Sequence, residues 1–285
     1  MQFSAPAKIN LALRVVRRRE DGFHEIETLM VPIAIRDTLD IETRVAGGID
    51  FTCSDTTLPT DDTNLVVRAA RGFFEATDIE PHVRIFLQKE IPHGAGLGGG
   101  SSDAATTLVA LDTIFQTQLP LAELTRIAAA IGSDIPFFLV RGAAWCRGRG
   151  ELVEPCALPD SLPLLLIKPP FAVPTPWAYQ RWRDSIEIPG VSYAPQTSQM
   201  LGGITLVNDL ERPVFEKFIQ LAEMKRWLLE QPEAAAALMS GSGSTMIAVL
   251  REKSLGPALA EKARAQFGEH TWRALTKTLR MTNDE

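Results

Sequence analysis

Apolar residues in the first half of the chain repeat at two spacings, one typical of strands and one typical of helices. Val83, Ile85 and Leu87 occupy every second position, as residues on the buried face of a half-exposed strand do. Leu108 and Leu111 instead share one face of a helix. The predicted strands of this half cover residues 3–16, 37–44 and 82–91. The predicted helices cover residues 64–77, 102–115 and 121–132.

The second half begins after a proline-rich stretch at 154–163, which is typical of a linker between domains. Asn208 and Glu211 have the spacing of a helix-capping box. The predicted elements are a strand at 162–169, a proline-rich loop at 169–179, one helix at 214–230, a glycine-rich turn entering a strand at 239–250, and a last helix. The pattern predicts an α+β fold in two domains, 1–155 and 156–285, with a cleft between them.

The composition is that of an ordinary globular protein and disfavours several classes. Hydrophobic residues make up 45% of the 285 residues, and the net charge of −6 is opposite to that of a general nucleic-acid-binding surface. No apolar run is long enough to cross a bilayer, and the N-terminus lacks the pattern of a signal peptide. Three cysteines without CxxC spacing argue against a disulfide framework or a zinc knuckle. We therefore expect a cytoplasmic monomer or homodimer that acts on a small molecule, without nucleic acid or membrane as a partner.

A segment at 91–103, here called the glycine loop, carries five glycines between positions 94 and 100. Successive glycine N–H groups turn toward one point and form a nest for an anion, and the N-terminus of the following helix adds positive potential. The missing Cβ atoms also let a phosphate chain approach the backbone closely. Ser101 or Ser102 is the expected N-cap of that helix. The loop predicts a binding site for phosphate groups.

Three familiar nucleotide-binding motifs do not account for this loop. Residues 94–99 match G-x-G-x-x-G, but a second helix follows where a dinucleotide-binding fold needs a strand. No Gly-Lys pair occurs in the chain, so a Walker A motif is absent. The His-Arg-Asp and Asp-Phe-Gly motifs of protein kinases are absent as well. A dinucleotide-dependent oxidoreductase is therefore the least favoured alternative.

Three segments taken together resemble the GHMP small-molecule kinases: PAKINL at 6–11, GLGGGSSDAA at 96–105 and MSGSGST at 239–245. Segments around Asp-Gly-Phe-His-Glu at 21–25 and Ser-Asp-Ile-Pro at 133–136 extend the likeness over nearly the whole chain. The resemblance implies the two-domain GHMP-kinase fold, with the active site between the domains. It also implies ATP-dependent phosphorylation of the 2-hydroxyl group of a cytidine-diphosphate-linked alcohol, in the non-mevalonate route to isoprenoid precursors.

The resemblance implies that Asp134 and Lys8 carry the chemistry. Asp134 would accept the proton of the alcohol as its oxygen attacks, in a transfer that otherwise depends on positioning and charge stabilisation. Lys8 would keep this carboxylate ionised and offset the charge on the transferring group. The local sequence leaves two other interpretations open: Asp134 caps the next helical turn, and Lys8 points to solvent.

The implied substrate-binding residues surround this pair. Asn10 follows Lys8 on the same strand face and would hydrogen-bond the substrate. His24 would contact the cytosine, because an imidazole donates or accepts as required. Phe23, where the family more usually has tyrosine, and Tyr179 would hold the base between their rings. An ordinary loop histidine and an aromatic packed on the linker are the alternatives for His24 and Tyr179. The implied set is Asn10, Phe23, His24, Thr175 and Tyr179.

The implied ATP-binding residues lie in the glycine loop and at the start of a helix. Asn64 would belong to the adenine pocket, although its position equally suits a helix N-cap. Mg²⁺ would accompany ATP without a cage of protein ligands, with Ser101 or Ser102 as a contact. Gly241 and Gly243 either bring a second loop against the cleft or form a tight turn. The implied set is Asn64, Pro92, His93, Gly94, Ala95, Gly96, Leu97, Gly98, Gly99, Gly100, Ser101 and Ser102.

Two other functions compete with this interpretation. Another GHMP kinase would act on homoserine, mevalonate or a sugar, but simple alcohols need no pair of rings for stacking a base. A non-catalytic nucleotide-binding regulator would bind ATP without needing both Lys8 and Asp134.

Overall fold

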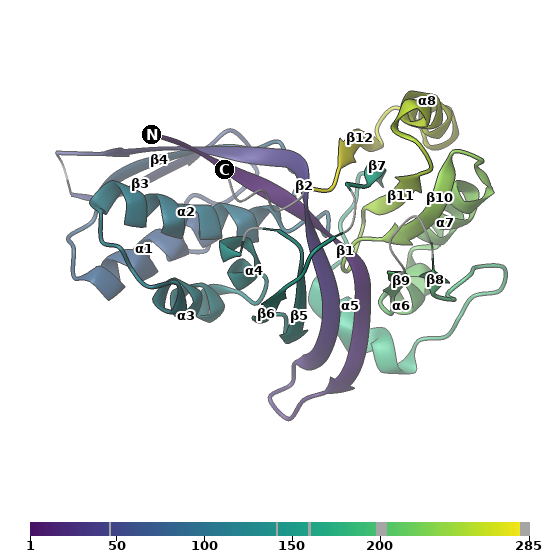
Figure 1. Cartoon of the computed structure of the whole chain (residues 1–285), viewed down its shortest axis with the longest axis horizontal. Helices are drawn as coiled ribbons and strands as arrows, with labels where there is room; N and C mark the ends of the chain where they lie inside the picture. Colours follow the sequence, from purple (N-terminus) through teal and green to yellow (C-terminus); the bar gives the residue numbers. More distant parts are fainter. Residues whose placement is uncertain (46, 141, 159–160, 198–203, 280–285) are drawn as a thin grey trace.

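Two β-sheets and their helices form the two lobes of the protein (Figure 1). The structure is a computed structural model that describes residues 1–45, 47–140, 142–158, 161–197 and 204–279. Strands β3 (Gly48–Cys53), β4 (His82–Gln88), β2 (His24–Thr43), β1 (Gln2–Arg18), β9 (Thr205–Asn208) and β8 (Gln196–Thr197) form the larger sheet in that order. Strands β5 (Ala144–Gly148) and β6 (Leu152–Pro155) extend it from β2. The smaller sheet has the order β10 (Ala234–Met239), β11 (Met246–Leu250), β7 (Pro163–Lys168) and β12 (Trp272–Lys277).

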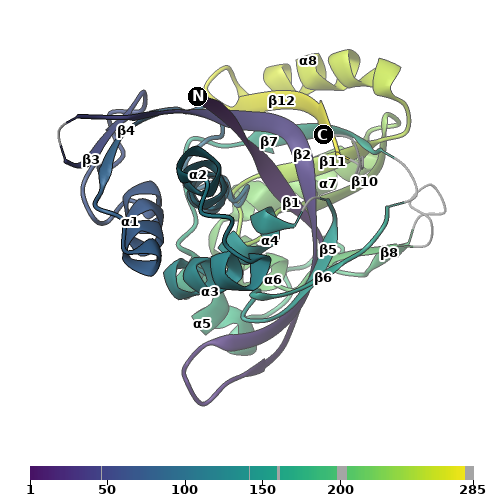
Figure 2. The ribbon, with the colours of Figure 1, turned by 60° about the vertical axis from the view of Figure 1, so that its left-hand side comes forward.

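Helices cover one face of each sheet. Helix α2 (Gly99–Phe115) packs against β1 and β2, and Figures 1 and 2 show it beside α1 (Leu65–Thr77), with α3 (Leu121–Ile131) and α4 (Ile135–Leu139) next to them. Phe73 on α1 is fully buried in this layer. The other lobe contains α5 (Thr175–Arg181), α6 (Glu211–Lys217), α7 (Ile219–Glu230) and α8 (Gly256–Phe267), with the 3₁₀ turns η1 (Trp182–Asp184) and η3 (Lys253–Leu255). Within the described ranges, no helix is long and apolar enough to cross a membrane.

The long hairpin of β1 and β2 joins the lobes and projects below them in Figure 1. Its pairing runs from Gln2 opposite Asp40 to Arg18 opposite His24. The register shifts between Pro6 and Lys8 and again after Asn10. Such irregularities bend a strand and re-aim its side chains. The two shifts bracket the part of β1 that carries Lys8 and Asn10.

Each strand and helix predicted in the first half overlaps an observed element, and two of the elements predicted in the second half are wrong. The helix expected over 214–230 is interrupted at Phe218, whose φ of −108° and ψ of 68° are not helical, so α6 and α7 are separate. The proline-rich loop expected at 169–179 contains the start of α5, because Pro176 lies in the first turn, where proline is tolerated. Periodicity also missed β10, an alanine-rich strand, and β12.

The capping box expected for Asn208 and Glu211 is wrong. Asn208 is the last residue of β9, and its amide group donates to the carbonyl oxygens of Met239 and Gly241. Glu211 is buried, forms an ion pair with Lys225 and accepts a hydrogen bond from the Met239 N–H at 2.8 Å. Tertiary contacts therefore use both side chains that the local spacing assigned to a helix end.

We predict that Lys225→Met strongly destabilises the protein, because it leaves the Glu211 carboxylate buried without its cation. Loss of one partner of a buried pair costs about 3–5 kcal/mol. Burial raises the pKa of Glu211, so the variant should regain part of this loss at acidic pH by taking up a proton. Urea unfolding of wild type, Lys225→Met and the exposed control Lys253→Met measures the effect. Equal unfolding free energies for all three would contradict it.

Candidate active site

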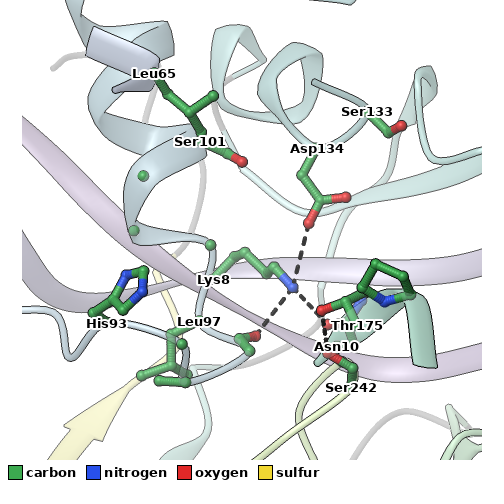
Figure 3. A pocket seen from close by; sticks show the side chains of 18 of the residues that line it. Lys8, Asn10, Leu65, His93, Leu97, Ser101, Ser133, Asp134, Thr175 and Ser242 are labelled. Atoms are coloured by element: carbon green, nitrogen blue, oxygen red, sulfur yellow. Dashed lines mark hydrogen bonds and ion pairs between the residues drawn. The ribbon is translucent and has the colours of Figure 1, made fainter. Parts of the chain in front are cut away.

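A cavity of about 830 Å³ opens between the glycine loop, the β1–β2 hairpin and α5 (Figure 3). Residues from both lobes line it, including the start of α4 and the segment between β10 and β11. That segment, residues 240–245, is called the C-terminal loop below. The cavity is large enough for nucleotide-sized ligands. It brings together segments that lie far apart in the sequence.

Lys8 lies at the floor of this cavity with its ammonium group surrounded by oxygen atoms. Its Nζ is 2.8 Å from Asn10 Oδ1, 3.1 Å from the Gly96 carbonyl and 3.6 Å from Asp134 Oδ2 (Figure 3). The backbone N–H of Lys8 also donates to the Leu97 carbonyl at 2.9 Å. Only 4% of the residue is exposed, so the alternative of a solvent-pointing lysine is wrong. The strand thus aims a positive charge at the side of the cavity formed by the glycine loop.

Asp134 is the residue that precedes α4, and its carboxyl group faces Lys8. It has the N-cap position of this helix, but its side chain makes no capping hydrogen bond, so the capping alternative is wrong. The Asp134 side chain is 33% exposed and lines the cavity. An ionised carboxylate with a nearby ammonium can accept a proton from an alcohol bound in the cavity.

Asn10 links this pair to the neighbouring strand. Its amide donates to Thr28 Oγ1 at 2.8 Å, and Thr28 donates to the Ala12 carbonyl at 2.6 Å. The amide orientation is fixed by this contact, so Asn10 Oδ1 remains turned toward the Lys8 ammonium.

The glycine loop has the backbone that its composition predicted. Gly94, Gly96 and Gly98 have φ values of 62°, 74° and 70°, in the left-handed region that other residues rarely adopt. A Cβ on Gly96 would lie 2.2 Å from the Ser240 carbonyl oxygen. Glycine at this position is therefore required both by conformation and by space.

The N-cap expected at Ser101 or Ser102 is wrong, because α2 begins earlier. Gly98 is its N-cap, and no side chain caps the helix. Its left-handed φ lets the chain turn into the helix directly from the glycine loop. Uncapped N–H groups at this end are well suited to an anion. Ser101 lines the cavity, whereas Ser102 is fully buried and its hydroxyl has no partner among the described residues.

Lys89, Asp37 and Asp103 form a buried cluster beside α2 that sequence reasoning missed. Lys89 donates to Asp37, and its Nζ is 2.9 Å from Asp103 Oδ2. Burial raises the pKa of Asp103 to about 8. The Lys89 ammonium opposes this rise, and the charge of Asp37 adds to it. Lys89 and Asp103 both line the cavity. The sequence carried no local signal for this cluster, because each of the three residues lies in a segment that holds other charged residues as well.

Asn64 and the remaining residues of the glycine loop line the same cavity. Asn64 Oδ1 accepts from the Val66 N–H at 2.9 Å, so its interpretation as an N-cap is confirmed. The same residue lines the cavity, and the two roles are compatible. The residues 92–101 all line it too.

Rings gather at the other end of the cavity. His24 is the buried first residue of β2, so the alternative of an ordinary loop histidine is wrong. Its ring stacks on Tyr179 with centroids 5.5 Å apart, and Trp182 meets it edge-on. Burial lowers the pKa of His24, with a contribution from Arg18, and burial also raises the pKa of Tyr179. Both groups are therefore neutral at neutral pH.

Phe23 lies at the mouth of the cavity and is half exposed. The Arg149 guanidinium lies over its ring, 4.8 Å from the centroid. The ring next to Tyr179 in this structure is therefore that of His24, and Phe23 is paired with a cation. Sequence reasoning missed Arg149 and Trp182, because neither lies in a segment with a recognisable local pattern.

The C-terminal loop lies against the cavity, as one of the two interpretations of Gly241 and Gly243 expected. A Cβ on Gly241 would be 3.2 Å from Asn10 Oδ1, and Ser242 Oγ is 2.7 Å from Thr175 Oγ1 at the start of α5. The loop thus touches both the floor of the cavity and the helix that carries Tyr179.

The described residues contain no group of three or more His, Cys, Asp or Glu side chains arranged to hold a metal ion. Ser101, Asp103 and Asp134 are oxygen-bearing residues on the cavity wall. These scattered oxygens suit a hard cation whose other ligands are phosphate oxygens and water.

Comparisons with known proteins identify relatives of this chain. The model of the GHMP kinases N terminal domain matches residues 64–142, and that of the GHMP kinases C terminal region matches 198–269. The chain is 41% identical to the 4-diphosphocytidyl-2-C-methyl-D-erythritol kinase of Methylacidiphilum infernorum and 38% identical to that of Thermodesulfovibrio yellowstonii, with 96% of each chain covered.

Solved structures show the same arrangement. A 4-(cytidine 5'-diphospho)-2C-methyl-D-erythritol kinase superposes with a TM-score of 0.79 at 37% identity, covering 98% of this chain and all of the other. The homoserine kinase of Cytophaga hutchinsonii has a TM-score of 0.66 at 18% identity, covering 98% and 95%, and shares the fold.

We predict that Gly96→Ala weakens ATP binding by at least about tenfold, because a Cβ strains the left-handed backbone and displaces the loop from Ser240. Gly47→Ala, in a surface turn without this conformation, is the control and should bind ATP as wild type does. Calorimetric titration with a non-hydrolysable ATP analogue measures both. Wild-type affinity in Gly96→Ala would refute the requirement for glycine.

Asp103→Asn should change how stability depends on pH. The native pKa of Asp103, about 8, lies above its ordinary value, so the proton it holds stabilises the fold fully in acid. That contribution is lost as the pH rises toward 8. Asparagine cannot titrate. Between about pH 5 and about pH 9, the free energy of urea unfolding should therefore decline less in the variant than in the wild type. If the unfolding free energies of wild type and variant declined equally with pH, Asp103 would not titrate as described.

Proposed function

Since this chain belongs to the GHMP kinase family, we propose that it transfers the γ-phosphate of ATP to the 2-hydroxyl group of 4-diphosphocytidyl-2-C-methyl-D-erythritol. The products would be the 2-phosphate of this alcohol and ADP. The reaction would be a step in the synthesis of isoprenoid precursors. The observation that carries the proposal is the Lys8–Asp134 pair, which lies in one cavity with the glycine loop and the His24–Tyr179 rings. A phosphate cradle and a stacking surface are what ATP and a cytidine nucleotide need.

Asp134 is the proposed base. Its carboxylate lines the cavity and makes no capping contact, so it is available to accept the hydroxyl proton. Lys8, 3.6 Å away, would stabilise the negative charge that develops on the transferring group. Phosphoryl transfer requires mainly this positioning and charge stabilisation.

The glycine loop and the N-terminus of α2 are the proposed phosphate site, and Asn64 would border the adenine. When bound, Mg²⁺ would neutralise phosphate charge, and the hydroxyl of Ser101, which lines the cavity, would contact it. Ser102 is a poorer candidate than Ser101 because its side chain is buried away from the cavity. We propose the cytoplasm as the compartment, because three free cysteines fit a reducing environment.

The alcohol would lie between Asp134 and the rings. His24, with its lowered pKa, has one donor and one acceptor nitrogen for the edge of cytosine. Tyr179 and Phe23 offer ring faces to the base, and Thr175 and Asn10 offer polar contacts. Stacking of a base on an aromatic ring is worth about 1–3 kcal/mol, which a simple alcohol substrate would leave unused.

ATP-dependent turnover should be seen with 4-diphosphocytidyl-2-C-methyl-D-erythritol and should be negligible with homoserine and mevalonate. The physical reason is that only the first of these substrates can occupy the ring-lined end of the cavity. ADP release, coupled to an optical assay, measures all three under the same conditions. Turnover with homoserine or mevalonate but not with the cytidyl alcohol would refute the substrate assignment.

Asp134→Asn should lower kcat by about 10²- to 10⁴-fold, the usual contribution of a general base. Asparagine keeps the size of the side chain but accepts no proton, so affinity for an ATP analogue should stay within about twofold. Quenched single-turnover kinetics and calorimetry give the two values. Near-normal turnover would remove Asp134 from the mechanism.

A further inference from the structure

Asn208 lies at the end of β9, where this strand runs parallel beside β1 with Asn208 opposite Leu13. The residue is buried, and its side chain makes three hydrogen bonds. Its Nδ2 donates to the carbonyls of Met239 and Gly241, each at 2.7 Å, and its Oδ1 accepts from the Leu210 N–H at 2.9 Å. Asn208 therefore fixes both ends of the turn from β10 into the C-terminal loop.

Ser240 lies between the two carbonyl groups that Asn208 holds. Its hydroxyl donates to the Gly96 carbonyl at 3.0 Å, and the same carbonyl accepts from Lys8 Nζ at 3.1 Å. The Thr245 N–H adds a hydrogen bond to the Ala95 carbonyl. A continuous series of contacts thus runs from Asn208 through Ser240 and Gly96 to the Lys8 ammonium.

This series has little room for independent movement of its parts. The space for a Cβ on Gly96 is already occupied by the Ser240 carbonyl, 2.2 Å from that position. The corresponding position on Gly241 is 3.2 Å from Asn10 Oδ1 and 3.5 Å from Lys8 Nζ. A shift of the C-terminal loop would therefore be passed on to the Gly96 carbonyl and to Lys8, because packed backbones do not absorb such a shift.

We propose that Asn208 is a positioning residue for catalysis: it fixes the C-terminal loop so that the Gly96 carbonyl holds the Lys8 ammonium beside Asp134. The inference rests on the proposed function and adds a residue to it. Asn208 acts through the loop and lies outside the cavity lining. A displacement of about 1 Å in a positioned catalytic group can cost about 10²-fold in rate.

Gln196 provides a matched control on β8, the strand that pairs with β9. Its side chain donates to the Ala237 carbonyl at 2.8 Å and accepts from the Ala237 N–H at 3.2 Å. These are again side-chain hydrogen bonds to the backbone of β10, but Ala237 lies two residues before Met239 and does not line the cavity. If Asn208 only tied down β10, loss of either side chain would have the same consequences.

The test compares kcat, both KM values and the thermal midpoint for wild type, Asn208→Asp, Ser240→Ala and Gln196→Ala. Aspartate keeps the acceptor for Leu210 but has no donors for the C-terminal loop. Asn208→Asp should lower kcat by about 10- to 100-fold, and Ser240→Ala by a smaller factor in the same direction. The KM of the alcohol should stay within about threefold, and Gln196→Ala should keep kcat within about twofold.

Ser240→Ala decides the question if Asn208→Asp does not fold, because it removes a single hydroxyl from the same series. The inference is overturned if Asn208→Asp and Ser240→Ala keep the wild-type kcat. It is also overturned if Gln196→Ala loses as much kcat as they do at an equal loss of thermal stability. The variants are assayed with whichever alcohol the wild type phosphorylates. A wild type inactive with every alcohol would refute the proposed function instead, so the two failures are distinguishable.

Discussion

The buried ammonium group of Lys8 is the constraint on which the site depends. A lysine with 4% exposure is costly to bury unless oxygen atoms replace its water, and here three do so from three different segments. Asn10 comes from β1 itself, Gly96 from the glycine loop, and Asp134 from the start of α4. Satisfying one charge therefore forces the strand, the glycine loop and the proposed base into a single arrangement.

Other features of the fold follow from this requirement. The register shifts in β1 aim Lys8 and Asn10 at the cavity, and the left-handed glycines let the loop backbone approach them. The second cation at this end of the cavity, Lys89, is paired with the carboxyl groups of Asp37 and Asp103. Lys8 is thus left with a single carboxylate partner within the described residues, which is the one placed to accept a proton.

The sequence predicted what local chemistry determines. The spacing of apolar residues predicted α1, α2 and β4, and the density of glycine singled out the loop before α2, where Gly94, Gly96 and Gly98 have left-handed φ values. The resemblance to a family named Lys8 and Asp134, and the structure shows them together. Contacts between distant segments were missed. Asn208 had the spacing of a helix cap, but its side chain donates to the Gly241 carbonyl, 33 residues away. The Arg149 guanidinium lies over the ring of Phe23, which is far from it in the sequence. Such pairings leave no periodic signal in a single sequence.

The central claim is that the Lys8 charge, held beside Asp134, stabilises the transferring phosphoryl group. The most direct test is the single-turnover rate of Lys8→Met with saturating ATP and 4-diphosphocytidyl-2-C-methyl-D-erythritol. Methionine retains much of the volume of lysine without its charge, so the rate should fall by about 10²- to 10³-fold, as when one stabilising group is lost from a transition state. A folded Lys8→Met variant that reacts at the wild-type rate would contradict the account.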